Sequence, residues 1–225
     1  MPWSWPKRVL WILAWLALPL SWWGSTVPLD SFILIHLLTA AGLIALVFVD
    51  RRWPLDRLDV ALLAVFLGLH IIGGRCAYSY TPYDAWWQAL FGVELSELCD
   101  WQRNHYDRLV HAAFGPLVGW PLARLLHRQG WSRPRAWGQT LLLLTAAATA
   151  YELLEWGVAM TLEPEQAETF NGQQGDHFDP HADIALALAA FGLTAPWLLR
   201  RPTTPTAADG QQAEATGCAN VCINK

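Results

Sequence analysis

Acidic and histidine residues recur within stretches of the sequence that are otherwise strongly apolar. In the first stretch Asp107 and His111 are four residues apart, and in the second Glu152 and Glu155 are three apart. These spacings place two side chains on the same face of a helix. Ionisable groups within a membrane are costly and by default indicate function. Both pairs are therefore candidate site residues.

A third polar stretch, residues 175–183, reads Gly-Asp-His-Phe-Asp-Pro-His-Ala-Asp. Asp176, Asp179 and Asp183 are spaced by three and four residues, so they would form a carboxylate ladder on a helix. Pro180 would lie in its first turn, where proline is tolerated. Asp176 or Asp179 could instead be a solvated loop acid or a helix N-cap, whereas Asp183 lies deeper in the apolar segment.

This many carboxylates in a partly dry pocket cannot all stay ionised without compensation. They must bind a cation, hold protons, or pair with basic residues. The candidate basic partners are His70, Arg75, Arg108 and His111.

The sequence predicts two kinds of chemistry for this set. Acid–base catalysis would use all seven residues of the three stretches: Asp107, His111, Glu152, Glu155, Asp176, Asp179 and Asp183. A divalent metal ion is the alternative, because oxygen-rich sites suit Mg²⁺, Ca²⁺ or Mn²⁺ and added histidine admits Zn²⁺. The predicted metal ligands are His111, Glu155, Asp179 and Asp183.

Long apolar blocks carry these residues. The chain has 225 residues, of which 54% are hydrophobic, 15% are charged and 15 residues are Trp. A membrane-spanning helix needs about 20 mostly apolar residues in a row, whereas a soluble domain scatters them at a period of 3.6 or 2. The sequence therefore predicts an all-α transmembrane bundle of about six spans: residues 9–23, 32–49, 59–73, 109–126, 136–160 and 182–199.

The basic residues give the expected orientation. They precede the first span, separate the second from the third and the fourth from the fifth, and follow the sixth. The positive-inside rule then places both chain ends in the cytoplasm, and all three polar stretches near the outer face. The expected transmembrane domain covers residues 1–201, and the Thr-, Pro-, Ala- and Gln-rich residues 202–225 are expected to be a disordered cytoplasmic tail.

The two longer outer connections differ in character. Residues 74–106 are rich in aromatic side chains, which suit the headgroup level of a membrane, and a short interfacial or re-entrant helix is expected within residues 84–101. The acidic run of Glu163, Glu165 and Glu168 is expected to be a solvated loop. Cys76 and Cys99 could pair only in an oxidising compartment. No basic patch suggests nucleic acid as a partner.

An ordered series of motifs resembles the YjdF-like family of bacterial inner membrane proteins. The series comprises Gly73-Gly74, Tyr78-Ser79-Tyr80, residues 104–111, Phe114-Gly115, Tyr151-Glu152 with Glu155-Trp156, and Gln174-Gly175-Asp176 with Asp179 and Asp183. The match covers roughly residues 7–200 and implies a multi-pass inner-membrane fold without an assigned reaction. The pattern also distantly resembles VanZ-like proteins, which are tied to glycopeptide-antibiotic tolerance.

Three functions stay open from the sequence. The first is an enzyme whose outward acids and histidine act on an envelope or lipid-linked substrate from the lipid bilayer. The second is a transporter of protons, metal ions or small solutes, although the polar groups gather at one depth. The third is a structural or partner-binding membrane protein, for which so many acids would be a costly way to fasten helices.

Overall fold

The computed structural model describes residues 5–200, and within them the chain is helical without any β-strand. The long helices are α1 (Trp5–Ser21), α2 (Leu29–Arg52), α3 (Arg57–Arg75), α6 (Tyr106–Arg128), α7 (Arg133–Ala159) and α9 (Asp179–Arg200). Each coincides within a few residues with one predicted apolar block. The predicted all-α membrane bundle is therefore confirmed.

Four of these helices, α2, α3, α6 and α7, are long and apolar enough to cross a membrane, judged over the described residues alone. Helix α1 has 17 residues, slightly fewer than the roughly 20 that span a bilayer. The predicted count of six spans and the orientation of the chain ends therefore stay predictions. The predicted tail, residues 202–225, lies outside the described residues.

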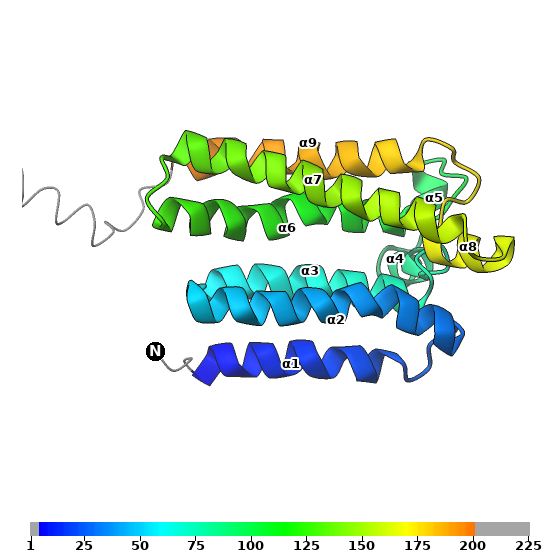
Figure 1. Cartoon of the computed structure of the whole chain (residues 1–225). Helices are drawn as coiled ribbons and strands as arrows, with labels where there is room; N and C mark the ends of the chain where they lie inside the picture. Colours follow the sequence, from blue (N-terminus) through cyan, green and yellow to red (C-terminus); the bar gives the residue numbers. More distant parts are fainter. Residues whose placement is uncertain (1–4, 201–225) are drawn as a thin grey trace, which may run out of the picture.

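The bundle has two distinct ends (Figure 1). Three short helices, α4 (Tyr83–Phe91), α5 (Leu95–Leu98) and α8 (Pro164–Asn171), gather at one of them, which we call the α8 end. The opposite end, called the arginine end, holds the α2–α3 and α6–α7 connections with Arg51, Arg52, Arg57, Arg128 and Arg133. Helix α1 begins and α9 ends at the arginine end.

The short helices test two expectations about the connections. Helices α4 and α5 confirm short helical structure within residues 84–101. The expectation of a loop around residues 163–168 is wrong, because α8 begins at Pro164. Proline suits the first turn of a helix, and α8 also buries Phe170 in a cluster with Val27 and Phe32.

The long helices form two groups. Helices α1, α2 and α3 pack together, and so do α6, α7 and α9. The α3–α6 contact joins the groups along their length, and α8 rests on α2 as well as on α7. Helix α6 is thus central, since it contacts α3, α7 and α9.

Two glycines allow α6 to approach α9 closely. A Cβ atom at Gly115 would collide with the backbone carbonyl of Ala187, and one at Gly119 would lie 2.8 Å from the Phe191 ring atom Cε2. Small residues four apart are common where membrane helices meet, because they let the backbones approach. The side chain of Phe191 fills the resulting seam and is fully buried.

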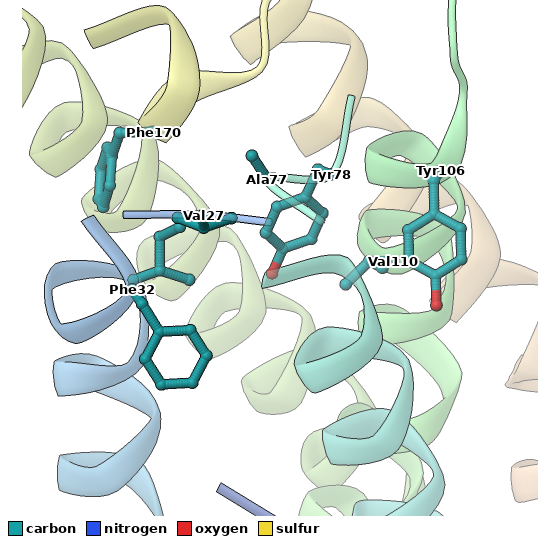
Figure 2. Packing of buried hydrophobic residues seen from close by; sticks show 8 residues of the cluster. Val27, Phe32, Ala77, Tyr78, Tyr106, Val110 and Phe170 are labelled. Carbon is teal, nitrogen blue, oxygen red and sulfur yellow. The ribbon is translucent and has the colours of Figure 1, made fainter. Parts of the chain in front are cut away.

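The chain folds back on α3 where that helix ends. Tyr78 has a positive φ of 51°, and its N–H donates to the carbonyl of Gly73 over 2.8 Å. The Tyr78 ring occupies the space that a side chain on Gly73 would need. Figure 2 shows the ring between Val27 and Val110, in the cluster where the two helix groups meet.

Candidate functional site

All seven predicted site residues lie at the α8 end. Asp107 and His111 open α6, Glu152 and Glu155 lie near the end of α7, Asp183 lies in the second turn of α9, and Asp176 and Asp179 lie before and at the start of α9. They separate into an outer layer of Asp176 and Asp179 and an inner layer of the other five. The two layers differ in how their charge is compensated.

Two arginines neutralise the outer layer. Arg103 Nη1 lies 2.7 Å from Asp179 Oδ1 and 3.4 Å from Asp176 Oδ2. Arg108 Nη2 also pairs with Asp176, and lies 3.4 Å from Asp179 Oδ1. The Asp179 side chain is 4% exposed, whereas that of Asp176 is 31% exposed. Two guanidinium groups thus face two carboxylates, so the charges of the outer layer balance.

The predicted three-rung carboxylate ladder is wrong at Asp176. Helix α9 begins only at Asp179, and the Asp176 carboxylate accepts a hydrogen bond of 2.9 Å from the N–H of Phe178. Such local bonds from aspartate compete with helix formation. The Phe178 hydrogen bond, together with the Arg108 guanidinium, holds the pKa of Asp176 below its usual value.

Arg103 was not predicted as a site residue. Its position depends on a hydrogen-bonded link between two connections: Asn104 N–H donates to Gln174 Oε1, and Gln174 Nε2 donates to the Asn104 carbonyl, both over 2.9 Å. The contact joins residues 70 apart in the chain. In the sequence, the only signal for this link was that Asn104 and Gln174 both belong to the motif series.

The inner layer surrounds His111. The imidazole Nε2 lies 3.6 Å from Asp107 Oδ1, one turn earlier on α6, and 3.8 Å from Glu152 Oε1 on α7. The two predicted helix-face pairs are therefore both present. Glu155 interacts with Tyr151 and Glu152 on its own helix. All four inner carboxylate side chains are buried.

Among the described side chains of residues 5–200, no lysine or arginine nitrogen lies within 4.0 Å of an inner carboxylate. In that range Glu152 Oε1 and Asp183 Oδ1 are buried and have no hydrogen-bond partner. Buried polar atoms of this kind call for an explanation such as an ion or a proton. The inner layer thus contains carboxylate oxygens that accept no hydrogen bond from a described residue.

The atoms best placed to share a cation belong to Asp107, His111 and Asp183. One candidate ligand atom from each lies within 4.8 Å of the other two. The structure therefore groups two of the predicted metal ligands, His111 and Asp183, with Asp107. The other two are not members of this group: Arg103 binds Asp179, and Glu155 lies beside Glu152.

Two of the predicted basic partners, Arg75 and His70, bind groups other than the acidic side chains. Arg75 Nη2 donates to the Gly24 carbonyl over 3.2 Å, because the α1–α2 connection lies beside the end of α3. His70 contacts hydroxyl groups instead, with Nε2 lying 2.6 Å from Thr39 Oγ1 and Nδ1 beside the Tyr78 hydroxyl. Burial raises the pKa of Tyr78 well above its usual value, so its hydroxyl stays protonated and can donate to Nδ1.

Comparison with known proteins places this bundle in a family. A family model described as "Predicted membrane protein (DUF2238)" matches residues 7–203 of the chain. The chain belongs to this family. The inner membrane protein YjdF of Escherichia coli (strain K12) is 29% identical over 183 residues, which cover 80% of this chain and 78% of the relative. No solved structure matches the chain.

This DUF2238 protein is accordingly a multi-pass protein of the inner membrane, and the YjdF-like resemblance read from the motif series is confirmed. The structure gives part of that series a physical reason: Gly73 leaves room for the Tyr78 ring, and Gly74 leaves room for the His36 ring. The distant resemblance to VanZ-like proteins stays a prediction.

Proposed function

We propose that this protein carries out metal-assisted or acid–base chemistry on an envelope or lipid-linked substrate at the outer face of the inner membrane. The observation that carries the proposal is the group of Asp107, His111 and Asp183, whose candidate ligand atoms lie within 4.8 Å of one another. Two carboxylates and an imidazole suit a divalent cation such as Zn²⁺ or Mn²⁺. Three protein ligands also leave a position for substrate.

The neighbouring acids suit proton transfer. Glu152 Oε1 lies 3.8 Å from His111 Nε2, and Glu155 interacts with Glu152 on the same helix. A chain of groups that can hold a proton next to a cation is the arrangement that general acid–base catalysis needs. The positive-inside rule, applied to the arginine end, supports an outward-facing α8 end.

A transporter is the alternative that the seam between α6 and α9 disfavours. Toward the arginine end the acidic layer is followed by Gly115 against Ala187 and by Gly119 against Phe191. Phe191 is fully buried, and a proton or ion pathway needs polar groups or water rather than a closed apolar seam.

Metal analysis of the purified protein tests the proposal. After saturation with Zn²⁺ or Mn²⁺ and removal of loose metal, we expect the wild type to retain about one equivalent, and His111→Ala and Asp183→Asn to retain little. Glu94→Gln is the matched control, because Glu94 is an exposed acid in the connection between α4 and α5. This variant should bind metal as the wild type does.

Other outcomes would favour the alternatives. Metal-free wild type with pH-dependent ion flux in proteoliposomes would support a transporter. Metal-free wild type without flux, whose His111→Ala and Asp183→Asn variants only melt at lower temperature, would support a structural cluster.

A further inference from the structure

A cavity of about 470 Å³ separates the two helix groups, lined by residues of α1, α2, α3, α6 and α7. This volume falls in the range of small-molecule sites, about 300–1,000 Å³. Along α6 the lining runs from Asp107 to Val118, and the eleven steps between these residues span roughly 16 Å at a rise of about 1.5 Å per step. The cavity is therefore long in the direction of the membrane normal.

Its lining is amphipathic along that length. Polar side chains gather at the α8 end, where they are Thr39, His70, Tyr78, Asp107, His111 and Tyr151. The remainder of the wall, down to Leu10 and Trp11 near the start of α1, is apolar. Asp107 and His111 thus belong both to the polar end of the cavity and to the candidate metal group.

One side of the cavity is not closed by helices. Gly42 and Ala45 of α2 and Ala147 of α7 line it and are exposed. Helices α2 and α7 are not among the helix pairs that pack extensively against each other in the described part of the chain. In a membrane, this side faces lipid.

The apolar part of this cavity disfavours water, and an apolar space left empty loses the packing contacts of its walls. Hydrocarbon from the bilayer can restore those contacts without crossing a polar layer. A compact apolar molecule would leave part of the long cavity unfilled and would not use its polar end.

We propose that this cavity holds the hydrocarbon chain of a lipid amphiphile, which enters between α2 and α7 and brings its polar headgroup to Asp107 and His111. The inference rests on the proposed function in one respect: it gives the substrate class of that same site. Headgroup recognition then occurs at the inner acidic layer, and the chain fixes the depth at which the headgroup sits.

Two glycines offer a matched test. Gly42 lines the cavity, and a Cβ atom added there meets nothing within 4 Å. Gly68 on α3 is equally unobstructed but does not line the cavity. Gly42→Trp should therefore fill the cavity, and Gly68→Trp should not. If Gly42→Trp fails to fold, Ala45→Phe replaces it, with Ala41→Phe as its control on the same helix.

The probe is phosphatidylglycerol with a diazirine in one acyl chain, diluted into phosphatidylethanolamine–phosphatidylglycerol vesicles that contain the protein. After photolysis, mass spectrometry locates the labelled peptides. We expect the wild type and Gly68→Trp to be labelled on the cavity-lining parts of α2, α3 and α6, and Gly42→Trp to lose this labelling several-fold. Equal labelling in the two tryptophan variants, or labelling of lipid-facing residues alone, would overturn the proposal.

Metal content, measured on the same samples, separates this inference from the proposed function. We expect Gly42→Trp to lose cavity labelling and keep its metal, and Asp183→Asn, at a residue of the candidate metal group that does not line the cavity, to lose metal and keep cavity labelling. If the wild type is labelled in the cavity but contains no metal, the lipid site is supported and the metal chemistry is not. Metal binding without cavity labelling would overturn the lipid site alone.

Discussion

Gly115 of α6 lies directly against the backbone carbonyl of Ala187 of α9, without space between them for even a methyl group. Each residue lies one helical turn further from the α8 end than a member of the candidate metal group: Gly115 follows His111 on α6, and Ala187 follows Asp183 on α9. This backbone contact therefore fixes the separation of the two site residues. Close packing and site geometry depend on the same glycine.

The Gly115→Ala substitution should consequently weaken both the fold and the site. Overpacking a tight contact typically costs about 1–3 kcal/mol, so we expect a lower melting temperature in thermal unfolding. Gly138→Ala on α7 is the control, because a Cβ atom there meets nothing within 4 Å. Equal melting temperatures for the two variants would contradict the close contact.

A buried ion pair at the arginine end ties α1 to the end of α2. Lys7 Nζ pairs with Asp50 and donates to the Leu55 carbonyl over 2.8 Å. Asp50 is fully buried and also accepts from Trp11 Nε1 over 3.1 Å and from the N–H of Leu55 over 2.8 Å. The pair therefore organises the α2–α3 connection as well as α1.

Lys7→Met should destabilise the protein by about 3–5 kcal/mol, because it leaves a buried carboxylate without its partner. The double variant Lys7→Met/Asp50→Asn should recover much of this loss, since both charges are then absent and the amide oxygen can still accept from Leu55. Denaturant unfolding in detergent measures both free energies. Arg57→Met removes an exposed basic residue at the same end and should have little effect. A double variant as unstable as the single one would refute the pairing.

The outer layer makes stability depend on pH in a defined direction. Because the pKa of Asp176 is lowered in the folded state, its contribution is present above the unfolded pKa and is lost as pH falls through the folded one. The melting temperature of Asp176→Asn should therefore lie below that of the wild type at about pH 7, and the difference should shrink below about pH 4. A difference that stays constant with pH would argue against the Arg108–Asp176 interaction.

Much of the fold was predictable from the sequence because a bilayer requires long apolar helices. The apolar blocks matched the long helices, and the i,i+4 spacing of Asp107 and His111 placed both side chains in one layer. Local periodicity suffices for such features, since each depends on the geometry of a single helix.

The partners across helices were less predictable, because sequence spacing says nothing about contacts between distant segments. Arg75 was a plausible counterion by depth, yet it binds the Gly24 carbonyl, and Arg103 takes that role through the Asn104–Gln174 link. The contribution of Gly115 and Gly119 was likewise missed, since only the position of α9 shows what they allow.

The arrangement of the two helix groups has a mechanical consequence. In the described part of the chain they share one lengthwise seam, α3 against α6, while α8 rests on α2 at one end only. Because this seam is the only extensive lengthwise contact between the groups in the described part of the chain, the groups could turn about it, and α8 would limit that movement at the α8 end. Such a movement would widen the gap between α2 and α7 most near the arginine end, which α8 does not reach.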